Sequence, residues 1–210
     1  MNDRTMSPAQ TARPKRADAQ RNEQTLLEAA AAVFVTSGVE APVREIAAKA
    51  GVGTATIYRH FPTRADLVIA VYRHQVEALA DAGPALLASS ATPHVALGHW
   101  IDLFVDFLVT KLGLAAVLQS DDPCFDPLHS YFLDRLLPVC TQLLEAAAAS
   151  GENRSDLKAH ELLRGVASLC TNSGSHGDDA RRLVDVLIAG LRRPQRFSGD
   201  DPDGGRSLKP

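Results

Sequence analysis

The residues of this sequence that could do chemistry are small, polar and basic side chains gathered in one short segment. Residues 54–60 read Thr-Ala-Thr-Ile-Tyr-Arg-His, and Ile57 is the one typical core residue among them. Small side chains let a helix approach base edges closely, and Tyr, Arg and His side chains can reach phosphate oxygens. Arg59 could read a base or lie in solvent, but a phosphate contact is favoured. The predicted nucleic-acid contacts in this segment are Thr54, Ala55, Thr56, Tyr58, Arg59 and His60.

Two short helices around a glycine-containing turn would position these side chains. Apolar residues at helical spacing predict a helix over 43–50, Gly51-Val52-Gly53 makes a tight turn, and a second helix covers about 54–60. An earlier helix over about 21–37 would support both of them. The pattern is that of a helix-turn-helix, whose second helix can lie in a major groove of DNA.

The remainder of the chain predicts further helices and no strands. Thr63 and Asp66 have the spacing of a capping box and open a long helix at about 64–82, which Gly83-Pro84 is expected to end. Pro138 is expected to kink or split a later helix. The other helices are expected over about 92–111, 126–150, 157–172 and 178–192, so the fold class is all-α.

Charge is distributed unevenly along the chain. The whole chain carries −3, but residues 1–64 hold nine Lys/Arg against six Asp/Glu, and residues 65–210 hold thirteen against nineteen. The N-terminal part alone is therefore expected to meet a polyanion. Residues 1–20 are interpreted as a flexible basic arm, in which Lys15 and Arg16 either enter a minor groove of DNA or remain solvated. Residues 193–210 are expected to be a disordered tail.

A close resemblance to the tetracycline-repressor (TetR) family lies in the run AGVGTATIYRHFPTRADL at residues 50–67. The resemblance in motif extends over residues 21–72, and the rest of the chain agrees with the family in helical architecture only. It implies that Arg44 contacts the operator backbone or a guanine and that Tyr58 and His60 hold phosphates. Arg64, at the start of the fourth helix, matches a basic residue that also holds a phosphate.

Two positions depart from the family pattern. Ala41-Pro42 stands where a pair of threonines is common, which removes a hydroxyl cap and a phosphate contact. Gly53 replaces the usual serine, and glycine is a tolerable N-cap. The expected fold is unaffected, but a backbone contact by residue 41 is not expected.

The resemblance implies two domains and a function. Residues 21–66 would form a three-helix DNA-binding domain, and residues 67–192 a helical domain for effector binding and dimerisation. The implied function is that of a repressor that binds a near-palindromic operator as a homodimer and leaves it when a small hydrophobic or amphipathic effector binds. An activator of the same family is the alternative, and an all-α enzyme with a structural helix-turn-helix is a remote third.

Two sets of apolar residues in the body have candidate roles. One set could line an effector pocket, although an aromatic stripe at helical spacing is more often ordinary core, and this hypothesis concerns the set as a group. It comprises Trp100, Phe104, Phe107, Phe132 and Leu143. The other set covers more than one face of the last two helices and predicts a dimer interface, against the alternative of a thick monomer core. It comprises Leu162, Val166, Leu169, Val184, Leu187, Ile188 and Leu191.

Other functional classes find no support in the sequence. No nucleophile–base arrangement, glycine-rich phosphate loop or metal-ligand spacing is present, so neither catalysis nor a cofactor or metal is expected. No apolar stretch is long enough to span a bilayer, and no apolar leader segment opens the chain. The expected location is the cytoplasm.

Overall fold

The fold is all-α, as the sequence predicts. The computed structural model describes residues 12–114, 125–154, 156–172 and 177–193. Outside its helices, one isolated antiparallel bridge joins Asn153 to Arg192 within these residues. The helices are α1 (Ala12–Ser37), α2 (Val43–Ala50), α3 (Thr54–His60), α4 (Arg64–Ser89), α5 (Pro93–Gly113), α7 (Pro127–Ala149), α8 (Ala159–Asn172) and α9 (Gly177–Gly190).

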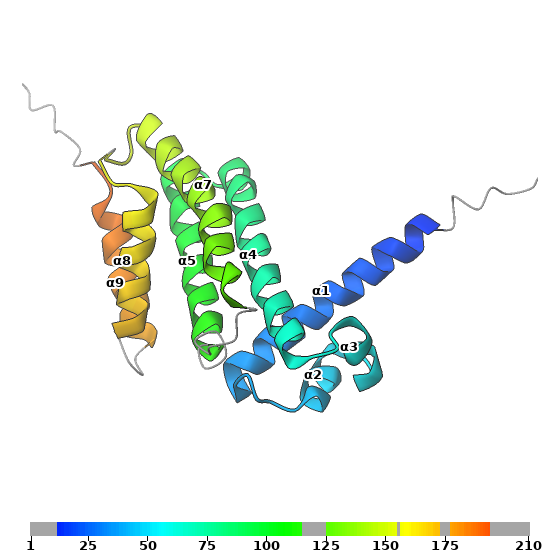
Figure 1. Cartoon of the computed structure of the whole chain (residues 1–210). Coiled ribbons are helices and arrows are strands. Elements are labelled where there is room, and N and C mark those ends of the chain that lie inside the picture. The colour runs from blue at the N-terminus through cyan, green and yellow to red at the C-terminus, as the bar shows by residue number, and fades with distance from the viewer. Residues whose placement is uncertain (1–11, 115–124, 155, 173–176, 194–210) are drawn as a thin grey trace, which may run out of the picture.

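The helices form a small lobe at one end of a larger bundle (Figure 1). The long helices α4, α5 and α7 lie side by side, and each contacts the other two. Helices α8 and α9 pair with each other and cover one side of this layer through contacts with α5. At the other end, α1 crosses the start of α4 and packs against α2, and α2 in turn contacts α3. No helix among the described residues is long and apolar enough to cross a membrane.

The first helix begins earlier than the sequence pattern indicates. It starts at Ala12, so the interpretation of residues 1–20 as a flexible arm is wrong for residues 12–20, and residues 1–11 lie outside the described part. Alanine, arginine, lysine and glutamine favour helix in this stretch. Pro14 is tolerated because the first turn of a helix needs no N–H from it. Lys15 and Arg16 therefore lie on a helical extension, and their side chains are outside the described set.

The expected end of the fourth helix at Gly83-Pro84 is also wrong, because α4 continues to Ser89. Gly83 is buried, and a Cβ placed on it would lie 2.2 Å from Cγ1 of Val139 on α7. Glycine thus allows α4 and α7 to lie unusually close together. Tertiary packing on both sides of Pro84 offsets the hydrogen bond that proline removes. Pro138 likewise lies inside a continuous α7.

Candidate nucleic-acid interface

Helix α3 presents polar side chains to solvent and buries its apolar ones. Ile57 is 1% exposed and Phe61, which follows the helix, is 7% exposed, so both fix α3 to the rest of the lobe. Tyr58 is 55% exposed, although large aromatic side chains are usually mostly buried. The remaining predicted contacts also face solvent, apart from one half-buried threonine. They are Thr54, Ala55, Arg59 and His60, with Thr56 half-buried.

A hydrogen bond within α3 directs its arginine. Nη2 of Arg59 donates to Oγ1 of Thr56 at 3.1 Å, one turn earlier on the same helix. The bond holds the guanidinium along the exposed face and leaves its other N–H groups free to meet an acceptor. The arrangement suits an arginine that binds phosphate or a base edge from the surface of a helix.

The turn between α2 and α3 has the geometry that the glycine predicts. Gly51 has φ of 68°, in the left-handed region that glycine adopts at little cost, and its N–H donates to Ala47 and Ala48. Ile46 and Ala47 are buried, while Arg44 on the opposite side of α2 is exposed. The helix-turn-helix therefore exposes Arg44 on the same lobe as the polar face of α3.

Helix α2 is attached to α1 by a contact that the sequence does not indicate. Oγ of Ser37, the last residue of α1, donates to Oε1 of Glu45 at 2.6 Å. Pro42 is the N-cap of α2 and makes no side-chain cap hydrogen bond. The start of α2 is therefore fixed by tertiary contacts and not by a cap of its own.

Arg64 does not lie where a phosphate-binding side chain is expected. It is half-buried, and its Nη2 donates to the carbonyl oxygen of Ala41. Its Cζ lies 5.5 Å from the ring centroid of Phe34, which is fully buried on α1. Its Nη1 is buried and has no hydrogen-bond partner. The guanidinium thus faces the interior of the lobe.

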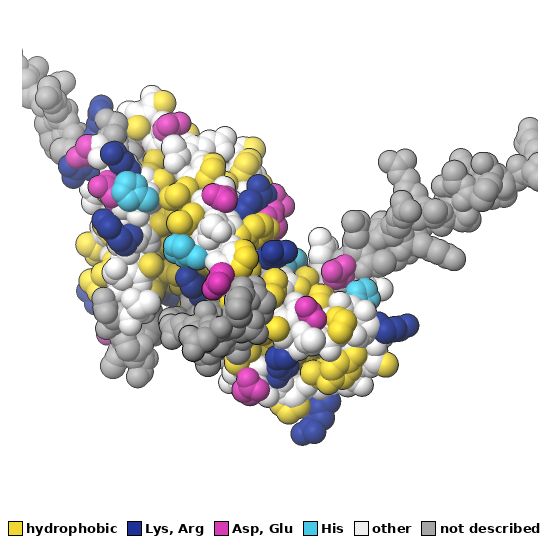
Figure 2. Space-filling view, viewed as in Figure 1, with side chains coloured by type: hydrophobic (Ala, Val, Ile, Leu, Met, Phe, Trp, Pro, Cys, Tyr) yellow, Lys and Arg dark blue, Asp and Glu magenta, His cyan; other side chains and the backbone are white. Residues whose placement is uncertain are grey.

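The space-filling view shows where exposed basic side chains lie on the molecule. Figure 2 shows dark blue Lys and Arg side chains at the outer edges of the lobe that contains α2 and α3. Basic side chains that project from the end of a molecule can reach phosphates on either side of a groove. The visible face of the bundle carries both signs of charge among its apolar side chains.

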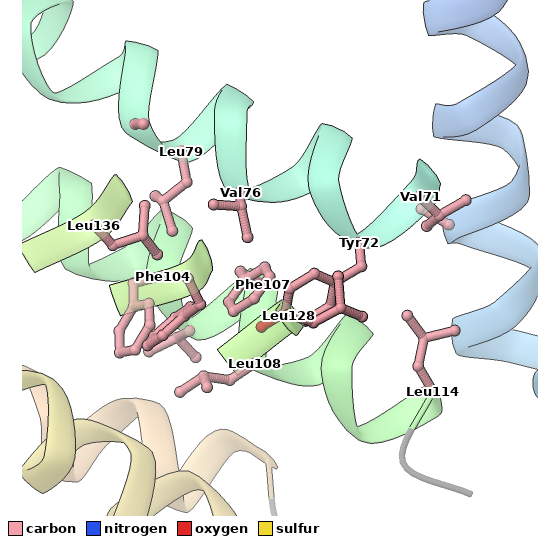
Figure 3. Packing of buried hydrophobic residues seen from close by; sticks show 14 of the residues in the cluster. Val71, Tyr72, Val76, Leu79, Phe104, Phe107, Leu108, Leu114, Leu128 and Leu136 are labelled. Carbon is pink, nitrogen blue, oxygen red and sulfur yellow. The ribbon is translucent and has the colours of Figure 1, made fainter. Parts of the chain in front are cut away.

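In the bundle, the candidate effector residues belong to one buried hydrophobic cluster, in which Figure 3 shows Phe104 and Phe107 near Tyr72. Trp100, Phe104, Phe107, Phe132 and Leu143 are all buried. Successive ring centroids lie 6.1 Å apart for Trp100–Phe104, 6.2 Å for Phe104–Phe107 and 5.7 Å for Phe107–Phe132. Tyr72 of α4 adds an edge-on contact to Phe107 at 5.6 Å, and burial raises the pKa of Tyr72 to about 12.

Two polar features accompany this cluster. Nε1 of Trp100 donates to the carbonyl oxygen of Leu79 on α4 at 2.8 Å. Nζ of Lys111 lies 5.4 Å from the ring centroid of Phe132, and burial lowers the pKa of this lysine. Three cavities lined by described residues lie elsewhere: between α7 and α8, between α5 and α9, and beside the end of α9. The pocket role of the five residues stays a prediction.

Most of the predicted dimer-interface residues lie inside the protomer. The structure buries Leu162, Val166, Val184, Ile188 and Leu191 within the protomer, so these five side chains offer little surface to a partner. They form the inner faces of α8 and α9, which pack on each other and on α5. Leu169 and Leu187 are half-buried.

The apolar residues that α9 does expose are not among the predicted interface residues. Leu183 is 49% exposed and Val186 is 65% exposed, one turn apart. Helical periodicity shows both as apolar positions but does not show that α8 and α5 leave them uncovered.

Sequence reasoning also misses a polar cluster between α4 and α7. Glu77 of α4 accepts hydrogen bonds from Tyr131 and, at two oxygens, from Arg135, both on α7. These bonds hold the pKa of Glu77 below its usual value. Arg73 lies over the ring of Tyr131 at 5.4 Å. Among the described residues, no group of three or more His, Cys, Asp or Glu could hold a metal ion.

Comparisons with known proteins find matches for both the DNA-binding lobe and the helical bundle. Residues 26–71 match the family model described as bacterial regulatory proteins of the tetR family, and residues 92–193 match that described as the C-terminal domain of SbtR-like transcriptional regulators. These two matches cover more than half of the chain. They place the helix-turn-helix in one domain and α5 to α9 in the other.

Solved structures extend the likeness over most of the chain. A TetR transcriptional regulator from Streptomyces coelicolor is 38% identical, with 81% of this chain and 98% of that chain covered at a TM-score of 0.69. A TetR transcription regulatory protein from Mycobacterium vanbaalenii is 31% identical, with 86% and 100% covered at 0.65. A transcriptional regulator from Saccharomonospora viridis, solved with choline, is 20% identical, with 83% and 100% covered at 0.61, which is a likeness of fold.

Proposed function

Since the chain belongs to the TetR family of bacterial transcriptional regulators, we propose that it represses transcription by binding a near-palindromic operator as a homodimer. Members of the family are DNA-binding regulators with a ligand-binding C-terminal domain, and they are not enzymes. The single observation that carries the proposal is the arrangement of α3, whose polar side chains face solvent while Ile57 and Phe61 are buried. The protein acts where it meets DNA, in the cytoplasm.

Base and phosphate contacts divide between the two short helices. Small residues at the start of α3, Thr54 and Ala55, let the helix enter a major groove, and Thr56 supports Arg59. Tyr58, Arg59 and His60 bind phosphates and so fix the position of α3 on the duplex. Arg44 is exposed on α2 and pairs with a guanine or the backbone.

Selection from a random pool of duplexes by the full-length protein tests this function. We expect an enriched site with two related half-sites whose centres are about 10 base pairs, or a multiple of that spacing, apart. A reporter gene with this site across its promoter should be silenced, whereas activation from an upstream site would indicate the alternative regulator. Failure to enrich any sequence at low salt would contradict DNA recognition altogether.

Dimerisation uses the outer faces of α8 and α9. Support comes from Leu183, Val186 and the half-buried Leu187, which recur at helical spacing and leave apolar area in solvent. A groove lined by Leu157, Val186, Leu187, Gly190 and Leu191 borders this stripe. A second copy of the chain would bury this surface.

A charged residue on this surface should separate the subunits without unfolding them. Val186→Glu places a carboxylate at a 65% exposed position and should give monomers in light scattering. Leu103→Glu, at a 41% exposed position on α5, is the matched control and should remain dimeric. A dimeric Val186→Glu variant would contradict this surface.

The effector site is proposed around the aromatic cluster, and the effector is a small hydrophobic or amphipathic molecule. The apolar rings of Phe104, Phe107 and Phe132 suit its body, and Lys111, whose Nζ lies over the ring of Phe132, suits a polar end. Tyr72 brings α4 into the same cluster, and α4 begins next to the DNA-binding lobe. A ligand that shifts α4 can therefore alter the separation of two recognition helices, which must be about 34 Å apart to enter successive grooves. Screening of small molecules for release of the selected duplex tests this step.

A further inference from the structure

The guanidinium of Arg64 joins three elements of the DNA-binding lobe. Arg64 is the first residue of α4, its Nη2 donates to the carbonyl of Ala41 just before α2, and its Cζ lies 5.5 Å from the ring centroid of Phe34 on α1. Ala41 and Phe34 are 3% and 0% exposed. One side chain therefore connects the start of the long helix with the start of the helix-turn-helix.

Near its start, helix α2 also has the hydrogen bond from Ser37 of α1 to Glu45, but it has no cap of its own. Its N-cap, Pro42, makes no side-chain hydrogen bond, and the turn before it is closed by a backbone bond from Ala41 to Gly38 at 3.1 Å. Without Arg64, the buried carbonyl of Ala41 would lose a charged donor, which costs more than loss of a neutral one. Helix α3 follows α2 through a three-residue turn, so a change at the start of α2 would alter the direction of the recognition helix.

The same geometry keeps Arg64 away from phosphate. Of its two terminal nitrogens, Nη2 is bonded to Ala41 and Nη1 is buried without a partner. A DNA phosphate could not reach Nη1 unless the side chain left Phe34 and Ala41. By contrast, Arg44 and Arg59 are exposed on the same lobe.

We propose that Arg64 is a positioning residue for DNA recognition, which fixes the start of α2 to the start of α4 and binds no phosphate. This inference rests on the proposed function, because it concerns the same DNA-binding surface. It separates two classes of arginine in the lobe: exposed ones that neutralise phosphate charge, and an inward one that sets the orientation of α3.

Two variants with one matched control test the proposal. Arg64→Met removes the hydrogen bond and the charge, Arg64→Lys retains the charge but loses the planar fork, and Arg59→Met removes an exposed arginine from α3. Affinities of the full-length proteins are measured for the duplex that the wild type selects and for a scrambled duplex of equal composition. Measurements are repeated at several salt concentrations, at a temperature where circular dichroism shows each variant folded.

Both Arg64 variants should weaken binding to the selected duplex about tenfold, at the lower end of the cost of one charged hydrogen bond. Binding to the scrambled duplex and its salt slope should stay as in the wild type. Arg59→Met should instead weaken both duplexes and reduce the slope of log affinity against log salt by about 0.9 for each lost phosphate contact.

Three results would overturn the proposal. Arg64→Met could reduce the salt slope as Arg59→Met does, Arg64→Lys could bind both duplexes like the wild type, or both variants could change thermal stability alone. If Arg64→Met does not fold, Arg64→Lys decides, since a phosphate contact predicts normal binding and a positioning role predicts loss of selectivity. A wild-type protein that selects no duplex would contradict the proposed function itself, which is a different outcome.

Discussion

The DNA-binding lobe exposes the side chains predicted to bind DNA, whereas the helical bundle buries its large aromatic side chains. In the lobe, Tyr58 is 55% exposed and Arg44 and Arg59 face solvent. In the bundle, Trp100 and Phe104 are at most 1% exposed. Substitution of these exposed lobe residues should therefore change DNA binding with little effect on stability, whereas substitution of the buried bundle residues should change stability first.

The largest expected effect is that of salt on the lobe. Two subunits that make about 6–10 phosphate contacts should lose roughly 10³–10⁵ in DNA affinity between 50 and 200 mM salt. The same change should move the unfolding temperature of the free protein little, because the core of the bundle is apolar. Fluorescence anisotropy and thermal unfolding in matched buffers measure both quantities. A DNA affinity that does not change with salt concentration would contradict phosphate binding by the lobe.

Trp100→Ala should have the largest effect on the bundle. Truncation of a fully buried tryptophan costs about 3–5 kcal/mol in the free energy of unfolding, and here it also leaves the Leu79 carbonyl without the indole donor. Denaturant titration at fixed protein concentration measures this loss. Leu103→Ala, at an exposed position on α5, is the control and should change stability by less than about 0.5 kcal/mol. Unchanged stability of Trp100→Ala would show that the aromatic cluster is not the core of the bundle.

Gly83→Ala tests the close approach of α4 and α7. The new Cβ would lie 2.2 Å from Cγ1 of Val139, whose β-branched side chain has little rotamer freedom in a helix. Overpacking of this kind costs about 1–3 kcal/mol, more than the gain of up to about 1 kcal/mol in helix propensity. The double variant with Val139→Ala should recover part of the lost stability in thermal unfolding. If Gly83→Ala alone is stabilising, the two helices do not lie this close.

Arg44→Ala should affect binding alone. If Arg44 pairs with a guanine, its loss should cost about 1–3 kcal/mol in DNA affinity and relax the preference at one base of each half-site. Repeated selection with the variant gives the base preference, and thermal unfolding gives the stability. An unchanged base preference with weaker binding would assign Arg44 to the backbone. A large loss of stability in Arg44→Ala would contradict the expectation that exposed lobe residues affect DNA binding alone.

The smallest expected effect is that of Glu77→Gln on the polar cluster between α4 and α7. Its hydrogen bonds with Arg135 and Tyr131 hold the pKa of Glu77 below 4.5 in the folded chain, so the ionised carboxylate stabilises the fold above that pH. The contribution disappears as pH falls through the folded-state pKa. The difference in unfolding temperature between wild type and Glu77→Gln should therefore be present at pH 7 and shrink below pH 4.5. A difference that grows in acid would contradict the assignment.

The sequence by itself determined the features that depend on neighbouring residues. The bounds of α2 and α3 follow from apolar spacing and from the glycine turn, and both are as predicted. The capping box is present, since the N–H of Asp66 donates to Oγ1 of Thr63 at 3.1 Å and its Oδ2 accepts from the Thr63 N–H at 3.0 Å. These are contacts within one helical turn, where residue type and spacing are sufficient.

Tertiary structure alone decided which face of each element is covered. Periodicity identifies Val184 and Val186 equally as apolar, yet Val184 is 1% exposed and Val186 is 65% exposed because α8 and α5 cover one side of α9. Arg64 matches a phosphate-binding position in sequence, but the nearby Phe34 and Ala41 turn it inward. Helix α4 continues beyond Pro84 to Ser89, and Gly83 packs closely against Val139 of α7. In each case the deciding partner is distant in sequence, so local pattern does not contain it.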